Sequence, residues 1–168
     1  MNKRDLEGVQ LLIVEDDQNS SRLLTDFLNA KGGAMIKHAV NGSDAIAMAR
    51  QDYFDVILVD LRLPGENGFM VTENIKRSCN RTPSIIVVSA FSDKQNRIRA
   101  FESGADAFFS KPIDLKELFL IIKNFSMQKK KNVERTISML EQMNQLGEDK
   151  LHRSGHSEEV KAFCKILG

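Results

Sequence analysis

The chain has few cysteines, no long apolar run and almost no net charge. Its two cysteines, Cys79 and Cys164, lie far apart in the 168 residues, and we expect free thiols in a reducing cytoplasm rather than a disulfide. The longest apolar stretch, Leu118–Ile122, is far too short to span a membrane. The polar segment Met1–Gly8 does not resemble a signal peptide. A net charge of +1 gives no bulk electrostatic argument for binding nucleic acid.

What the chain does contain is a series of short apolar runs rich in Val, Ile and Phe. They are too brief for helices and read as buried strands of a parallel sheet. Four of them end at polar residues, and a fifth ends at Asn41-Gly42. The runs are Leu11–Val14, Met35–Val40, Val56–Val59, Ile85–Val88 and Ala107–Phe109.

Helical spacing of apolar residues fills the intervals between these runs. We expect Ser43 and Asp114 to cap the helices that follow them, and the stretch with Pro64, Gly65 and Gly68 to be a loop. The alternation predicts an α/β fold, a doubly wound five-stranded parallel sheet with helices on both faces. The predicted helices are Gln18–Ala30, Ser43–Arg50, Phe69–Cys79, Asp93–Ser103 and Asp114–Phe125.

The polar residues at the strand ends predict a site for a divalent cation and a phosphoryl group. In an open α/β sheet, ligands bind at the carboxyl ends of the strands, so residues 15–17, Asp60, Ser89 and Lys111 should meet at one edge. An aspartate can accept a phosphoryl group as an acyl phosphate. Lys111 would then pair with the phosphoryl oxygens, and Ser89 would donate a hydrogen bond to one of them.

Mg²⁺ prefers oxygen ligands and keeps several waters. We expect Asp16 and Asp60 to bind Mg²⁺ (or Mn²⁺) directly, Glu15 through a water, and the backbone carbonyl of Arg62 as a further ligand. Each residue alone has a simpler interpretation. Residues 15–17 would also suit the start of a helix, Asp60 and Ser89 would suit caps, and Lys111 would suit a solvated surface. The coincidence at four strand ends favours the site.

Four blocks of sequence resemble the receiver domain of bacterial two-component response regulators. They are Leu12–Asp17, Val59–Gly65, Val87–Ala90 and Gly104–Pro112, and the resemblance covers residues 8–126. It implies a flavodoxin-like strand order 2-1-3-4-5. It also implies that Asp60 accepts a phosphoryl group from a histidine kinase or a histidine phosphotransfer protein, and that the protein catalyses only its own phosphorylation and dephosphorylation.

The resemblance assigns further roles. Ser89 would sense the phosphoryl group and Phe108 would be the switch aromatic, although core packing alone would also explain Phe108. The Lys111–Pro112 peptide bond should be cis. By analogy with the family, Arg62 and Phe91 flank the path of attacking water and would tune the lifetime of the acyl phosphate.

The resemblance leaves three functions open. One is a signalling module that acts through protein contacts, and the second is the receiver fragment of a DNA-binding transcriptional regulator. The third, an aspartyl-phosphate hydrolase such as the haloacid dehalogenase phosphatases, needs an aspartate two residues after the nucleophile, where this chain has Arg62.

The composition changes at Ser126, and residues 127–168 are interpreted as a helical extension or a linker to an output domain. The basic run 129–131 reads as a solvated junction. An amphipathic helix is expected over 133–146, a turn over Gly147–Gly155 and a short helix over Glu158–Leu167. The 133–146 helix could fold back on the receiver or pair with its copy. A homodimer could therefore use this helix or the 93–125 face. A metal site at His152 and His156 is disfavoured, because Ser154-Gly155 lies between them and weakens a helix that would align the two side chains.

Overall fold

The computed structural model describes residues 5–79, 82–91 and 93–154, and for 142–154 it describes the backbone alone. The chain divides into two compact units, Met1–Gln128 and Lys129–Gly168. No helix in the described ranges is long and apolar enough to cross a membrane. The predicted helix over Glu158–Leu167, His156 and Cys164 lie outside the described residues.

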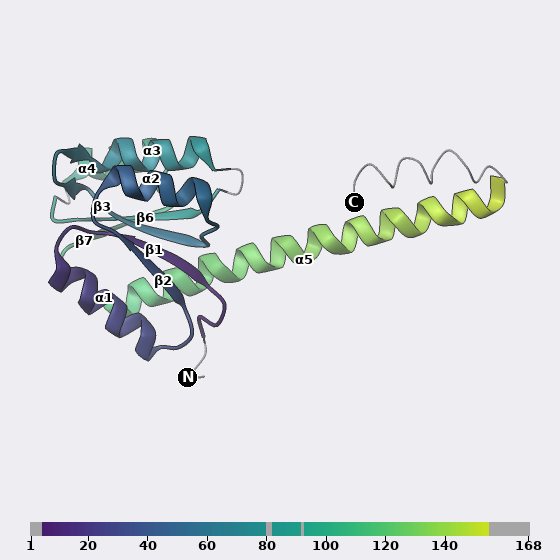
Figure 1. Ribbon diagram of the computed structural model, residues 1–168, viewed down its shortest axis with the longest axis horizontal. Helices are drawn as coiled ribbons and strands as arrows, with labels where there is room; N and C mark the ends of the chain where they lie inside the picture. Colours follow the sequence, from purple (N-terminus) through teal and green to yellow (C-terminus); the bar gives the residue numbers. More distant parts are fainter. Residues whose placement is uncertain (1–4, 80–81, 92, 155–168) are drawn as a thin grey trace. The chain divides into compact units, whose positions relative to one another are not determined.

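The first unit contains a five-stranded parallel sheet in the order β2-β1-β3-β6-β7 (Figure 1). Counted along the chain within this sheet, the order is 2-1-3-4-5, so the prediction is confirmed. β3 is central and buried throughout, because its neighbours β1 and β6 cover both of its edges and helices cover both faces. The strands are β1 (Gln10–Val14), β2 (Met35–Ala39), β3 (Val56–Asp60), β6 (Ser84–Ser89) and β7 (Ala107–Ser110).

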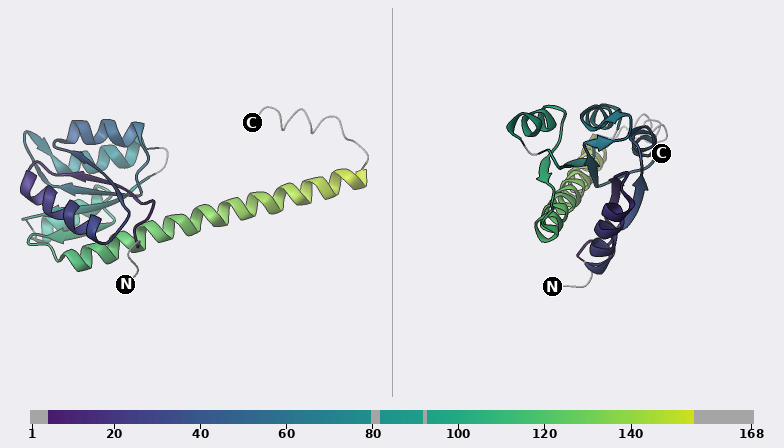
Figure 2. Two further views of the ribbon diagram at one scale, coloured as in Figure 1. Left: turned by 60° about the horizontal axis from the view of Figure 1, so that its bottom comes forward. Right: turned by 90° about the vertical axis from the view of Figure 1, so that its left-hand side faces the viewer.

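Helices cover both faces of the sheet, and each face has its own apolar core (Figures 1 and 2). Successive strand residues point to opposite faces, so Ile57 and Val59 belong to one core, whereas Val56 and Leu58 belong to the other. α2 (Gly42–Gln51), α3 (Gly68–Ser78) and α4 (Lys94–Glu102) cover the first core. α1 (Gln18–Ala30) and the beginning of α5 (Leu115–Ser154) cover the second.

Three local predictions were wrong. Asn41 rather than Ser43 caps α2, because the Asn41 side chain accepts the Asp44 N–H while Ser43 lies inside the helix. The segment after Asp60 is not a plain loop but a small antiparallel hairpin, β4 (Arg62–Leu63) and β5 (Glu66–Asn67). α5 continues through Gly147 to Ser154, where a turn was expected. Its helical neighbours on both sides outweigh the modest intrinsic cost of one glycine.

Two other local predictions are confirmed. The Asp114 carboxylate accepts the N–H groups of Lys116 and Glu117 at the start of α5. The Lys111–Pro112 peptide bond is cis.

Candidate functional site

Three parallel strands bring Glu15, Asp60 and Lys111 together at the carboxyl edge of the sheet. The Lys111 ammonium lies 2.7 Å from Glu15 Oε2 and 2.5 Å from Asp60 Oδ2. Both carboxylates are almost fully buried, at 6% and 5% exposure. One cation therefore bridges two carboxylates that are separated by 45 residues of sequence.

Backbone groups hold the other oxygens of these carboxylates. The N–H of Arg62 donates to Asp60 Oδ1 at 2.8 Å, and the N–H of Asp17 donates to Glu15 Oε1 at 3.3 Å. Asp60 thus ends β3 with one oxygen held by its own chain and one by Lys111. Such a carboxylate is fixed in direction before any ligand arrives.

Burial and charge act in opposite directions on the ionisable groups. Burial raises the pKa of Glu15, the hydrogen bond from Lys111 lowers it in part, the charge of Asp60 raises it again, and the net pKa lies above the ordinary value. Burial lowers the pKa of Lys111, but its hydrogen bonds with Asp60 and Glu15 outweigh that effect, and its net pKa is raised. Lys111 is therefore held as an ammonium ion.

These groups line an open hollow of about 530 Å³, which we call the acidic hollow. The side chain of Asp16 is exposed there, whereas Asp17 is occupied in capping α1 through the Ser20 N–H at 2.7 Å. Arg62, Leu63 and Pro64 of the hairpin also line it. The lining residues are Glu15, Asp16, Asp17, Ser20, Asp60, Arg62, Leu63, Pro64 and Lys111.

The Ser89 side chain is not among the residues that line the hollow. Ser89 is fully buried, and its Oγ accepts the N–H of Phe91 at 3.0 Å. Its backbone carbonyl accepts the N–H of Lys111 at 2.8 Å, so the ends of β6 and β7 lie side by side. The structure therefore brings Ser89 next to the site through its backbone, with its hydroxyl engaged by the following loop.

The three remaining predicted residues form two cation–π contacts. The Arg62 guanidinium lies 5.5 Å from the centre of the Phe91 ring, which is 53% exposed. The Arg97 guanidinium lies 5.8 Å from the ring of Phe108. Phe108 is half-buried and packs against the core beneath α2, α3 and α4. Arg62 from β4 and Phe91 from the segment after β6 thus contact each other beside the hollow.

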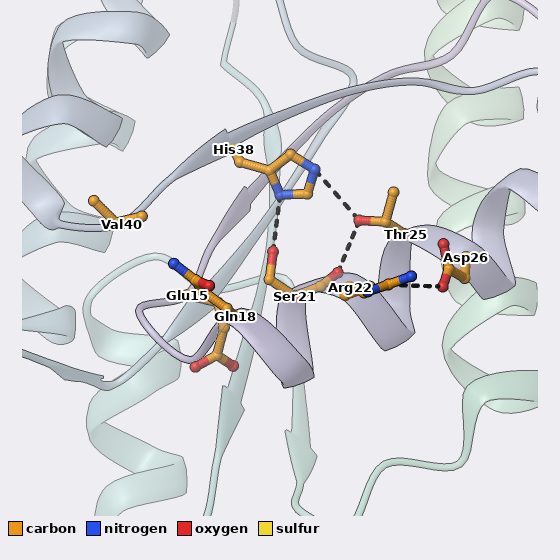
Figure 3. Close-up of a pocket in the computed structure, with 8 residues that line it drawn as sticks. All are labelled: Glu15, Gln18, Ser21, Arg22, Thr25, Asp26, His38 and Val40. Carbon is orange, nitrogen blue, oxygen red and sulfur yellow. Dashed lines mark hydrogen bonds and ion pairs between the residues drawn. The ribbon is translucent and has the colours of Figure 1, made fainter.

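A second hollow, of about 350 Å³, lies between α1 and β2 (Figure 3). Its central residue, His38, accepts or donates hydrogen bonds with Ser21 Oγ at 2.9 Å and Thr25 Oγ1 at 3.3 Å. Arg22 and Asp26 form an ion pair on α1 at 3.7 Å. The hydrogen bonds of His38 with Ser21 and Thr25 join α1 to the edge strand β2.

Glu66 of the hairpin and Gly68 at the start of α3 support the site, and sequence reasoning missed both roles. A Cβ atom on Gly68 would lie 2.6 Å from Leu61 Cα and 2.7 Å from the Asp60 carbonyl oxygen, so only glycine fits. The Glu66 carboxylate accepts hydrogen bonds from Gly42 N–H, Ser43 N–H and Ser43 Oγ, which joins the hairpin to the start of α2. The Asn67-Gly68 pair could have indicated the close backbone approach at Gly68. No pattern in the sequence could have linked Glu66 to Gly42 and Ser43, which lie 24 and 23 positions earlier.

The donor chemistry of the acidic hollow fits a hard, hydrated cation. Within the described ranges, no three histidine, cysteine or carboxylate side chains converge closely enough to form a ready-made metal cage. Mg²⁺ does not need one, because it usually keeps several waters and takes one or two carboxylates. The hollow offers Asp16, Asp60 and Glu15 for that purpose.

Comparison with known proteins agrees with this geometry. Residues 11–123 match the family of the response regulator receiver domain, and the chain belongs to that family. Transcriptional regulatory protein ResD of Bacillus subtilis is 36% identical over 114 residues, which are 68% of this chain and 46% of ResD. Response regulator PleD of Caulobacter vibrioides is 34% identical over 120 residues, 71% of this chain and 26% of PleD. The chain thus spans half or less of these relatives.

Receiver domains are among the solved structures that share this fold. The receiver domain of the TMAO respiratory system response regulator TorR is 31% identical, with a TM-score of 0.65, over 71% of this chain and 98% of that one. The receiver domain of sensor histidine kinase PA1611 from Pseudomonas aeruginosa is 26% identical, with a TM-score of 0.64, over 71% and 98% of the two chains. That structure has a magnesium ion coordinated in the active site cleft.

Proposed function

We propose that this receiver domain accepts a phosphoryl group on Asp60 in a Mg²⁺-dependent reaction and thereby controls a partner or an output domain. The observation that carries this proposal is the contact of one ammonium, Lys111, with two nearly buried carboxylates, Glu15 and Asp60, at the edge of an open hollow. Burying two carboxylates lowers the free energy of unfolding. Groups buried at such a cost are typical of a site that binds a ligand.

Phosphoryl transfer depends mainly on positioning and on charge stabilisation. Asp60 Oδ2 would attack phosphorus, the bond from phosphorus to the histidine nitrogen of the donor would break, and the nitrogen would keep the bonding electrons. Lys111 would move from the Asp60 carboxylate to the incoming phosphoryl oxygens, which carry the same negative charge. The protein would then act on itself alone and not as a classical enzyme.

The metal would be Mg²⁺ or Mn²⁺. Asp16 and Asp60 would hold it directly, Glu15 through a water, and the backbone carbonyl of Arg62 would add a ligand. When bound, the cation neutralises charge on the transferring group. The carboxylates of the acidic hollow and the magnesium reported in the PA1611 receiver domain support this assignment.

Phosphorylation would act through Ser89 and Phe108. The added phosphoryl oxygens offer strong acceptors, and the Ser89 hydroxyl would leave the Phe91 N–H to donate to one of them. The β6–α4 loop would move with it, and Phe108 would shift into the vacated space. The half-buried position of Phe108 supports this role. The ligand would only bias an equilibrium between two existing states.

Arg62 and Phe91 would set how long the acyl phosphate lasts. Arg62 lines the acidic hollow and contacts Phe91, and the pair would shield Asp60 from water, so Arg62→Ala should speed the loss of phosphate by several-fold. The test is the decay of the phosphorylated fraction, followed by intact mass. Arg77→Ala, an exposed arginine on α3 paired with Glu73, is the control. An unchanged decay rate in Arg62→Ala would contradict the proposal.

The donor would be a histidine kinase or a histidine phosphotransfer protein in the cytoplasm. We assign residues 8–126 to the receiver and 127–168 to a helical extension or a linker. The output could be a protein contact, a homodimer through the 93–125 face or the 133–146 helix, or a DNA-binding domain, as the description of ResD as a transcriptional regulator suggests. The exposed Ile98 and Phe101 of α4 support an interaction role for the 93–125 face. Nothing in the chain's net charge favours nucleic acid.

Intact mass spectrometry with a small phosphodonor tests the function. Wild-type protein with Mg²⁺ should gain the mass of one phosphoryl group, and the gain should vanish in the presence of a chelator. Asp60→Asn should gain nothing, whereas Asp55→Asn, a buried aspartate at the other end of β3, should still be modified. No gain in wild type, or an equal gain in Asp60→Asn, would overturn the assignment.

A further inference from the structure

The part of α5 beyond residue 128 carries a stripe of apolar side chains that is about half exposed. Val133, Ile137 and Leu140 are 51%, 49% and 56% exposed. Their spacing of four and then three residues places them on one face of a helix. Burying this face would remove apolar surface from water, which favours association with a partner.

The same spacing defines a heptad repeat. Val133 and Leu140 take position d, Ile137 takes position a, and Lys130 takes the preceding a position. β-branched Ile at a with Leu at d favours a two-stranded parallel coiled coil, and a single Lys at a fixes the register at some cost in stability. Met139 is more exposed, at 65%, but it takes position c, outside the seam.

The charges beside the seam decide the orientation. In a parallel dimer, position g of one helix lies next to position e of the following heptad in the other helix. Lys129 at g would therefore meet Glu134 at e of a second copy, and the pair has opposite charges. In an antiparallel dimer centred on this segment, Glu134 would meet Glu141 of the second copy, and these charges repel.

We propose that residues 129–141 form a parallel, in-register, two-stranded coiled coil with a second copy of this chain. The seam consists of Val133, Ile137 and Leu140, and the flanking ion pairs join Lys129 of each copy to Glu134 of the other. This inference specifies the partner and the orientation of the homodimer raised above, and it does not depend on phosphoryl transfer. Two heptads give a short seam, so the dimer is weak and its population rises with protein concentration.

Sedimentation equilibrium of the full chain over a range of concentrations tests the seam. Ile137→Asn should weaken dimerisation by about tenfold or more. Met139→Asn removes an equally apolar side chain from the same helix but outside the seam, so it should leave the dissociation constant nearly unchanged. Circular dichroism establishes that both variants keep the helix. A monomer at every concentration, or an equal effect of the two substitutions, would overturn the proposal.

A mixing experiment tests the orientation. Lys129→Glu and Glu134→Lys each place like charges together in a parallel homodimer, so each variant alone should dimerise more weakly than wild type. Mixed together, they should form a heterodimer, because Glu at 129 then meets Lys at 134 in one pair and Lys129 meets Glu134 in the other. Recovery of dimer on mixing supports the parallel register, and the absence of recovery overturns it. Adding Asp60→Asn to each of these variants should leave its dimerisation unchanged. A failure of the coiled coil can therefore be distinguished from a failure of phosphorylation on Asp60.

Discussion

Lys111 is the residue that joins the two buried carboxylates of the site. Its ammonium satisfies one oxygen of Glu15 and one of Asp60, and these two carboxylates would otherwise repel each other at the end of the sheet. A phosphoryl group that arrives at Asp60 brings new anionic oxygens within reach of the same ammonium. Under the proposed function, the contact would be a resting arrangement that the phosphoryl group redirects without moving the strands.

The raised pKa of Glu15 predicts a specific pH effect in metal-free buffer. Below about pH 4, folded and unfolded protein both keep the proton on Glu15, so this group does not affect stability. As the pH rises through the unfolded pKa and then the higher folded pKa, the buried carboxylate increasingly destabilises the folded state. Glu15→Gln should therefore raise the thermal midpoint at about pH 7 and leave it unchanged near pH 4.

Glu102→Gln, which changes an exposed carboxylate at the end of α4, is the control for this comparison. It should leave the pH profile as in wild type. A lower midpoint for Glu15→Gln at neutral pH would show that the carboxylate stabilises the fold, contrary to the account.

The second prediction concerns Gly68, because backbone atoms lie close to the position that a Cβ atom would take there. In Gly68→Ala the new Cβ would collide with Leu61 Cα and with the Asp60 carbonyl oxygen, neither of which can rotate away. We expect a loss of about 1–3 kcal/mol in the free energy of unfolding and a weaker affinity for Mg²⁺, since the collision displaces the segment after Asp60. Denaturant titration and calorimetry measure the two effects.

Gly65→Ala, in the turn between β4 and β5, is the matched control. Gly65 has φ of 69°, but no atom lies within 4 Å of the position of its Cβ. It should cost about 1–2 kcal/mol through backbone strain alone and leave Mg²⁺ affinity nearly intact. Equal losses of Mg²⁺ affinity in the two variants would refute the role assigned to Gly68.

Among the elements, the five main strands were the easiest to predict. Runs such as Val56–Val59 are apolar on both faces, rich in β-branched residues, too short for a helix and bounded by polar residues, which is typical of a covered parallel strand. The helix α1 was predicted at its observed bounds because Asp17 precedes a clear apolar stripe and Gly32-Gly33 follows it. The hairpin β4–β5 was not predicted, because strands of two residues are too short to show the alternation of apolar and polar residues.

The N-cap of α2 shows a different limit of prediction from sequence. Asn41 and Ser43 are both good capping residues, and sequence alone could not rank them, because the choice depends on a contact from outside the helix. Ser43 Oγ donates to Glu66 at 2.6 Å, which leaves Asn41 as the cap. A contact across 23 residues decided a local feature.

This contact predicts that Glu66 stabilises the hairpin only when it is ionised. The hydrogen bond from the Ser43 hydroxyl is the largest effect and lowers the pKa of Glu66. Burial opposes it, the N–H groups of Gly42 and Ser43 lower the pKa further, and the net pKa is lowered. A lowered folded pKa stabilises the protein above the unfolded pKa and loses this effect as the pH falls through the folded pKa. Glu66→Ala should therefore lower the thermal midpoint at neutral pH, and the difference from wild type should shrink in acid.

Glu73→Ala is the control, since Glu73 forms an exposed ion pair with Arg77 on the same helix. It should change the midpoint far less than Glu66→Ala at neutral pH. A difference between Glu66→Ala and wild type that persists unchanged in acid would show that the carboxylate charge is not what holds the hairpin.

For the whole molecule, the site could be predicted because parallel topology sends every strand end to one edge. Asp16, Asp60 and Lys111 meet at the acidic hollow for that reason, although 95 residues separate the first from the last. The partner of the Ser89 hydroxyl could not be predicted, because it depends on how one loop turns after β6. The length of α5 beyond Gly147 was also missed, since helix propagation depends on neighbours more than on one residue.

The central claim is that Asp60 itself, and no other carboxylate of the hollow, forms the bond to phosphorus. Borohydride reduces an aspartyl phosphate to homoserine, so phosphorylated protein can be reduced, digested and sequenced by tandem mass spectrometry. The account predicts homoserine at position 60 alone, and only in samples that contained Mg²⁺ and the phosphodonor. Homoserine at position 16 or 17, or at no position in protein that had gained phosphoryl mass, would contradict it.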